Sequence, residues 1–296
     1  MSNEMGPLDE NIEKYKKLYG DARKQMFGII NFGQTIIETY RERIEKNFLI
    51  RFPMLFLHEA LQSGRGFLLL TKDDSINHPS GAAVLLRNGF ESIVWGTSCL
   101  DDDVGSDLIE YVWNHQDIMF EKDMVICKKW NLPYSEERLS HLEEAKQRLN
   151  KTVTSNNKFQ LQGMPLRKSY SIKQIKKVFH ELVDRNGVFK YYFETSYKLA
   201  TNAWHSSSFG MRLTQYEEVK HYFLGNVANG FSECLKIFST EAIRKFTGTE
   251  DFGSLLYKGV SESLKKQMER IEKGENIKIS PSAELVLKFK ETGKNK

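Results

Sequence analysis

Apolar residues recur along most of the chain at the three- and four-residue spacing that places them on one side of an α-helix. Alternating apolar and polar runs, which would indicate strands, are scarce, and only six prolines interrupt the 296 residues. The pattern predicts an all-α protein built as a multi-helix bundle. The expected helices cover residues 8–47, 53–72, 81–98, 101–130, 135–151, 171–185, 188–205, 213–245, 253–273 and 282–290.

Glycine, proline and acidic residues set three of the expected helix boundaries. Gly28 or Gly33 is expected to break the first helix. Pro53 is expected to begin the second, because proline is tolerated in a first turn. Asp101–Asp103 are expected to cap the fourth helix and to place acidic side chains at its positive end.

One long stretch interrupts the helical pattern. A polar run at 152–157, followed by Gly163-Met164-Pro165, predicts an irregular loop over 151–170. We expect this loop to connect an N-terminal half (1–150) to the C-terminal helices (171–296), the two completing one compact domain.

The charge is unevenly distributed, although the formal net charge is only +4. Residues 101–123 contain eight acids and one lysine, whereas residues 151–190 contain nine basic residues and two acids. The basic segment is predicted to face an anionic partner such as RNA, with Lys173, Lys176 and Lys177 in contact. The alternative is that the two segments are solvated faces that attract each other within a dimer.

Several classes of site lack support in the sequence. The three cysteines have no C-x-x-C spacing and the histidines have no H-x-x-x-H spacing, so no metal is expected. No phosphate-binding glycine loop is present, and no cofactor is expected. The longest apolar run is too short for a membrane span and the first residues do not read as a signal peptide, so we expect a cytoplasmic protein.

Arg87 and Glu91 are the first candidate site residues. They lie four residues apart in an apolar helix, where their side chains share one face and can pair. One interpretation is an internal ion pair that fixes the helix. The other is that Arg87 binds a phosphate or carboxylate while Glu91 orients it.

Histidines supply the other candidates. His205 ends a helix and precedes three serines, which suits either a proton-transfer residue or a histidine stabilised by the helix dipole. Arg51 and His58 are separated by six residues, and His58 alone is interpreted as a half-buried core residue.

An aromatic group precedes His205 in the sequence. It is expected to be core, with a base-stacking surface as the alternative, and it consists of Phe189, Tyr191, Tyr192, Phe193 and Tyr197.

Three segments resemble a family of uncharacterised bacterial helical proteins. They are His58-Glu59-Ala60, Leu85-Leu86-Arg87-Asn88-Gly89-Phe90-Glu91, and Tyr197-Lys198-Leu199-Ala200-Thr201-Asn202-Ala203-Trp204-His205-Ser206. The resemblance covers about residues 45–210. Gly89 lies inside the expected helix 81–98, where glycine lowers helix stability by about 1 kcal/mol relative to alanine. Its presence predicts close approach of another helix at this position.

The spacing of Arg51 and His58 is similar to the arginine-and-histidine pattern of higher-eukaryote and prokaryote nucleotide-binding (HEPN) ribonucleases. This resemblance implies an HEPN-like bundle with metal-independent RNA cleavage, as in toxin-type and anti-phage defence effectors. Arg87, Glu91 and His205, with Arg51 and His58, would then surround one phosphate.

Two other functions stay open. One is a non-catalytic helical subunit that binds a protein partner in a defence complex. The other is a sensor that binds a nucleotide or another small ligand in the same polar pocket. A homodimer is compatible with each.

Overall fold

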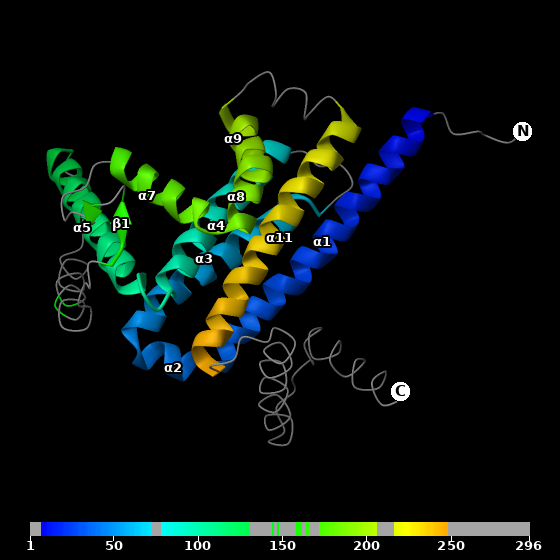
Figure 1. Cartoon of the computed structure of the whole chain (residues 1–296). Helices are drawn as coiled ribbons and strands as arrows, with labels where there is room; N and C mark the ends of the chain where they lie inside the picture. Colours follow the sequence, from blue (N-terminus) through cyan, green and yellow to red (C-terminus); the bar gives the residue numbers. More distant parts are fainter. Residues whose placement is uncertain are drawn as a thin grey trace, which may run out of the picture.

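The computed structural model describes residues 7–72, 78–130, 144, 147, 158–161, 164, 165, 172–205 and 216–247. These residues are almost entirely helical, which confirms the predicted all-α multi-helix bundle (Figure 1). The elements are α1 (Pro7–Thr39), α2 (Arg41–Lys46), α3 (Phe48–Leu70), α4 (Pro79–Cys99), α5 (Gly105–Lys129), β1 (Gln160–Leu161), β2 (Met164–Pro165), α7 (Ile172–Asp184), α8 (Gly187–Tyr192), the π-helical turn η1 (Phe193–Tyr197), α9 (Lys198–His205) and α11 (Glu217–Thr247).

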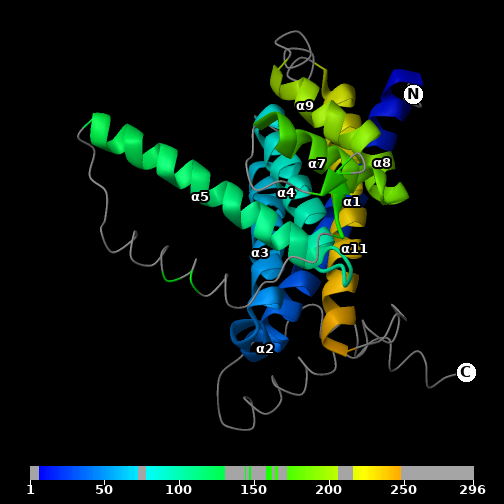
Figure 2. The ribbon, with the colours of Figure 1, turned by 60° about the vertical axis from the view of Figure 1, so that its left-hand side comes forward.

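The two longest helices, α1 and α11, lie side by side in both views (Figures 1 and 2). They run in the same direction, because early residues contact early residues and late residues contact late ones. The rings of Tyr19 and His221 are 5.4 Å apart, and those of Tyr40 and Phe246 stack at 4.2 Å. This pair therefore joins the beginning of the described chain to its end.

Helices α3 and α4 form an antiparallel pair against α1 and α11, and Gly89 lies where α4 meets both α3 and α11. A Cβ atom at Gly89 would lie 2.8 Å from Ser63 Cβ on α3 and 2.6 Å from the ring of Phe231 on α11. The predicted close approach at Gly89 is therefore confirmed. Gly96, two turns later, meets Phe238 of α11 in the same way.

Helices α7, α8 and α9 form a second layer on α4 and α11. On α7, Val178, Phe179 and Leu182 are buried, while Lys176 and Lys177 are exposed. The layer places the π-helical turn η1 against α11 and helix α9 against α4.

Helix α5 begins beside α4 and extends away from the other labelled helices (Figure 2). Asp101 stabilises the turn before this helix, because its Oδ1 accepts hydrogen bonds from the backbone N–H groups of Asp103 and Val104. The helix itself begins at Gly105, four residues after the expected start, and Asp107 is the acid in its first turn. The expected irregular stretch 151–170 contains a short antiparallel ladder, β1 with β2. Just before it, Phe159 is fully buried and donates its backbone N–H to the carboxylate of Asp107.

Two expected boundaries are wrong for physical reasons. Helix α1 continues through Gly28 and Gly33 and ends at Thr39. Gly33 is a packing position, because a Cβ there would lie 2.7 Å from a methyl group of Leu61. Pro53 lies inside α3, since Asn47 caps that helix six residues earlier by accepting a hydrogen bond from the Leu49 N–H.

Three further expectations concern the later helices. The expected helix 188–205 contains the π-helical turn η1 between α8 and α9. Of the expected helix 135–151, only Glu144 and Gln147 are described, and both are helical. The expected helices 253–273 and 282–290 lie outside the described residues.

Candidate functional site

Arg87 and Glu91 lie one turn apart on α4, and Arg87 Nη2 is 3.4 Å from Glu91 Oε1. The spacing that the sequence shows therefore produces the expected ion pair. The side chain of Arg87 is 26% exposed and that of Glu91 is 38% exposed. The pair lies at the surface of the bundle, where solvent still reaches both charges.

The hydroxyl group of Tyr197 lies between the two charges. It donates a hydrogen bond to Glu91 Oε1 (2.6 Å) and accepts one from Arg87 Nε (3.3 Å). The guanidinium carbon also lies 5.5 Å from the centroid of the Tyr197 ring, within cation–π range. We refer to Arg87, Glu91 and Tyr197 as the α4–η1 cluster.

The π-helical turn η1 explains how Tyr197 reaches α4. A π turn adds a residue to a helical turn and so rotates the side chains that follow it relative to those before it. Ser196 Oγ donates a hydrogen bond to the carbonyl oxygen of Asn226 on α11 (3.2 Å). Helix α11 comes so close that a Cβ atom at Gly230 would lie 2.5 Å from Ser196 Oγ. Within this turn, Ser196 faces α11 while Tyr197 faces α4.

Burial raises the pKa of Tyr197 to about 12. The hydrogen bond to the Glu91 carboxylate also raises this pKa, because the proton is held between the two oxygens, whereas Arg87 opposes the shift. The phenol is therefore neutral near neutral pH and acts as a donor to Glu91. The charges of Arg87 and Glu91 balance each other, and the neutral phenol links them through its two hydrogen bonds.

Aromatic rings enclose Tyr197 on its inner side. Its ring centroid is 4.8 Å from Phe193, 5.4 Å from Phe90 and 6.0 Å from Phe179. The cavity beside these residues has a volume of only about 10 Å³, which is the space of a single water molecule. A larger ligand would approach Arg87 and Glu91 from the solvent.

His205 is the last residue of α9, and its side chain lies outside the described part of the structure. Its backbone is eight residues beyond Tyr197, which corresponds to about 12 Å along an α-helix. Tyr197 is thus the residue of this segment that the described contacts bring to Arg87 and Glu91. The role predicted for His205 stays a prediction.

Arg51 and His58 are exposed on α3. The interpretation of His58 as a half-buried core residue is wrong: its neighbours Leu57 and Leu61 are fully buried, while His58 faces outward with its Nε2 atom 3.5 Å from Gln62 Nε2. Within the described ranges, no contact joins Arg51 or His58 to the α4–η1 cluster. The HEPN-like pairing of these two residues also stays a prediction.

The three predicted RNA-binding lysines belong to α7. Lys176 and Lys177 are exposed, and only the backbone of Lys173 is described. On the same helix, Phe179 contacts the ring of Tyr197. The basic face of α7 is therefore an outer surface of the layer that carries the α4–η1 cluster.

Sequence reasoning assigned Tyr197 to an aromatic core group and missed its polar role. That expectation holds for Phe189 and Phe193, which are buried, and is wrong for Tyr191, which is exposed. The available signal was chemical, because a buried tyrosine hydroxyl needs a hydrogen-bond partner. The paired charges of Arg87 and Glu91 were such partners.

In the part of the chain that the structure covers, the His, Cys, Asp and Glu side chains include no group of three placed to hold a metal ion. None of its helices combines the length and the apolar content needed to cross a bilayer.

Comparisons of the chain with protein-family models, with curated proteins and with solved structures find no match.

Proposed function

We propose that this protein is an HEPN-like, metal-independent ribonuclease of the defence-effector type, and that the α4–η1 cluster binds the phosphate that is attacked. The observation that supports the proposal is the grouping of a guanidinium, a carboxylate and a phenol around one half-exposed point. Metal-independent cleavage of RNA needs a base, an acid and a cation, and these three groups supply them.

In this proposal, Glu91 accepts the proton of a ribose 2′-hydroxyl. The 2′-oxygen forms a bond to phosphorus while the bond between phosphorus and the 5′-oxygen breaks. A protonated Glu91 no longer accepts the phenol proton, so Tyr197 gives that proton to the leaving 5′-oxygen. Transfer of the proton from Glu91 to Tyr197 then restores the cluster, and Arg87 stabilises the charge that develops on the phosphate oxygens.

Two other predicted groups complete the proposal. His205 is the alternative proton donor, and Lys173, Lys176 and Lys177 hold the RNA backbone. The expected partner is therefore RNA, and a cytoplasmic location remains the expectation from the sequence.

The test is cleavage of labelled RNA by the purified protein in EDTA. Glu91→Gln and Arg87→Lys should each lower the rate by about 10²-fold or more, the usual range for a lost catalytic group. Comparison of Tyr197→Phe with His205→Ala identifies the proton donor. Glu194→Gln is the matched control, because it removes the carboxylate of an exposed ion pair with Lys198 in the same layer.

Absence of cleavage by the wild-type protein on any RNA would exclude this function. Equal rates for Glu91→Gln and Glu194→Gln would exclude the α4–η1 cluster as the site. Circular dichroism melts of each variant separate a loss of activity from a loss of folding.

A non-catalytic function is the second candidate, and a specific observation favours it. The three groups of the cluster already satisfy one another and join α4 to η1. In this alternative the cluster is structural, and the protein is a helical subunit that binds a protein partner. It requires that Arg87→Ala lowers the melting temperature while the wild-type protein leaves RNA intact.

A further inference from the structure

Helix α5 packs on the bundle through its first half. The ring of Tyr111 stacks on that of Trp95 on α4, with the centroids 6.2 Å apart, and the ring of Trp113 lies 6.0 Å from that of Phe52 on α3. Beyond these contacts the helix extends away from the other labelled helices (Figure 2). We refer to this projecting part, residues 114–130, as the α5 arm.

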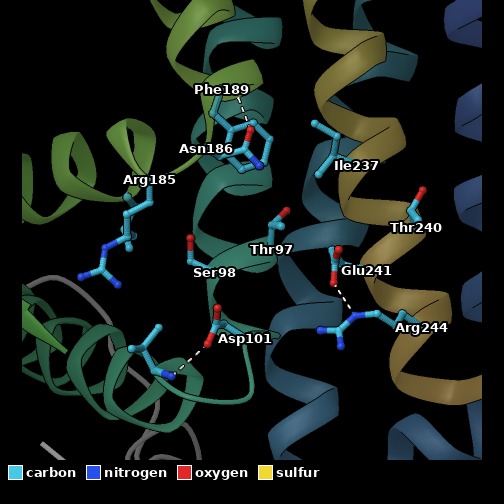
Figure 3. Close-up of a pocket in the computed structure, with 12 residues that line it drawn as sticks. Thr97, Ser98, Asp101, Arg185, Asn186, Phe189, Ile237, Thr240, Glu241 and Arg244 are labelled. Carbon is cyan, nitrogen blue, oxygen red and sulfur yellow. Dashed lines mark hydrogen bonds and ion pairs between the residues drawn. The ribbon is translucent and has the colours of Figure 1, made fainter. Parts of the chain in front are cut away.

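The charges around the beginning of α5 are matched within the chain. The turn before α5 borders a cavity of about 470 Å³ between the end of α4, the α7–α8 junction and α11 (Figure 3). On the cavity wall, Arg244 donates a hydrogen bond to Glu241 at 2.8 Å, and Asp101 Oδ1 accepts two backbone N–H groups. Arg185 lies 3.7 Å from Glu181. The features that indicate an external partner lie at the other end of the helix.

The end of the α5 arm carries apolar residues on several sides. Met124, Val125, Ile126 and Cys127 are consecutive, and successive residues of a helix point about 100° apart. Trp130 continues the helical spacing, because its N–H donates to the Ile126 carbonyl oxygen at 3.0 Å. Val125 is 66% exposed, Ile126 51% and Trp130 67%. A helix whose apolar residues are not confined to one side is normally buried, so we expect a partner to cover the arm.

One neighbouring helix is not sufficient to cover the arm. Helix packing buries an apolar stripe that is typically about 100° wide. Val125 and Cys127 lie about 160° apart around the helix axis. A helix of the same chain, such as the one expected over residues 135–151, would cover one of these sides and leave the other exposed. A second molecule is therefore needed to cover the remaining side.

The charge pattern of α5 favours a second copy in antiparallel orientation. Residues 105–117 contain three acids and no lysine or arginine, whereas residues 118–129 contain three lysines and two acids. Antiparallel pairing places the acidic half of one α5 beside the lysine-bearing half of the other, whereas parallel pairing places like charges together. Two arms overlap along their whole length when the two-fold axis passes near their midpoint at Lys122. Such a pairing is closed and ends at a dimer.

We propose that two copies of this chain form an antiparallel dimer through their α5 arms. Ile126 and Trp130 of each copy pack in the interface, and the two bundles lie at opposite ends of the paired arms. The inference does not depend on the proposed ribonuclease activity, because it rests on residues outside the α4–η1 cluster.

The first test is sedimentation equilibrium of the full-length protein over a dilution series. We expect a mass twice the 34.4 kDa of the chain. Ile126→Glu should raise the dimer Kd about tenfold or more, because it places an unpaired carboxylate in an apolar interface. Leu69→Glu is the matched control, since it makes the same type of change at the end of α3, where Leu69 is 73% exposed. Circular dichroism melts of both variants confirm that they are folded.

Cross-linking then determines the orientation of the two arms. Lys122→Cys and Trp130→Cys are each prepared in a Cys127→Ser background, in which the other two cysteines, Cys99 and Cys234, are buried. A short bismaleimide should link two copies through position 122, because these positions meet near the two-fold axis. It should not link them through position 130, because eight residues on either side of the axis separate these positions by about 24 Å.

Three results would overturn the proposal. They are a wild-type protein that stays monomeric at every concentration, equal dimer Kd values for Ile126→Glu and Leu69→Glu, and equal cross-linking through positions 122 and 130. All three measurements are made without RNA, so failure of the dimer and failure of the ribonuclease proposal are distinguishable.

Discussion

Tyr197 controls the chemistry of the α4–η1 cluster at the scale of single residues. Its hydroxyl group is the only described group that contacts Arg87 and Glu91 together, and it is 110 and 106 residues away from them in sequence. The spacing of Arg87 and Glu91 was sufficient to predict their pairing. The position of Tyr197 was not predictable, because it depends on the π-helical turn and on the closeness of α11 at Gly230.

Tyr197→Phe should change how stability depends on pH. The folded-state pKa of Tyr197 is raised from 10.0 to about 12, so the stability that its phenol contributes is fully present below pH 10.0 and is lost as the pH rises toward 12. Urea unfolding across this window should therefore show a difference between wild type and Tyr197→Phe that shrinks with pH. Tyr222→Phe, at an exposed position of α11, is the control. A difference that stays constant from pH 10.0 to 12 would contradict the assigned shift.

Single residues also show why sequence reasoning misplaced His58. Leu57 and Leu61 gave His58 apolar neighbours in sequence, yet both leucines face the core and His58 does not. Successive residues of a helix differ by about 100° in direction, so sequence neighbours are poor guides to burial. The positions that share the exposed face of His58 are Leu55, three residues before it, and Gln62, four residues after it.

At the scale of helices, glycines act as packing positions in this bundle. Gly33, Gly89 and Gly96 each lie where a Cβ atom would meet a side chain of another helix at less than 3 Å. A glycine inside a helical pattern indicates either a break or a close contact, and the pattern alone does not distinguish them. The first helix was therefore predicted to break at Gly28 or Gly33, whereas it ends at Thr39.

Gly89→Ala should destabilise the protein. The added methyl group meets Ser63 Cβ and the Phe231 ring, and overpacking typically costs about 1–3 kcal/mol. The better helix propensity of alanine offsets about 1 kcal/mol of that cost.

Gly28→Ala is the matched control, since no atom lies within 4 Å of a Cβ placed at this exposed helical glycine. It should stabilise the protein by about 1 kcal/mol through helix propensity. Urea unfolding of both variants measures the contrast. Equal shifts of the same sign would show that α4 does not pack at Gly89 as described.

At the scale of the whole molecule, the helical fold class was predictable because periodicity is a local property of the sequence. The pairing of helices was not predictable, since it depends on contacts such as that of Gly89 with Phe231.

The charge asymmetry was visible in the sequence as well. The structure adds that the described acids at the start of α5 are partly neutralised within the chain, Asp103 by Lys158 and Asp102 by Arg244 and Lys245.

Reversing the charge of the basic face of α7 should weaken RNA binding if RNA is the partner. In the double variant Lys176→Glu, Lys177→Glu, affinity should fall and its dependence on salt concentration should flatten by about one unit of slope for each lost phosphate contact. The control is Lys17→Glu, Lys24→Glu, which makes the same charge change on the exposed face of α1. Filter binding across a salt series measures both quantities, and identical slopes for the two variants would exclude α7 as the RNA-binding face.

The side-by-side arrangement of α1 and α11 has a consequence for how the chain reaches its native state. Gln25 of α1 bonds to Glu233 of α11 across 208 positions, and Arg43 of the following helix α2 bonds to the carbonyl oxygen of Phe246 across 203. Contacts of such long sequence separation form late and slow folding, because a long loop must close before they contribute. During synthesis, α1 leaves the ribosome before α11 and lacks its main packing partner until α11 has emerged. The apolar surface that α1 presents to α11 thus has no partner on that helix for most of translation, and we expect the nascent chain to depend on chaperones during this period.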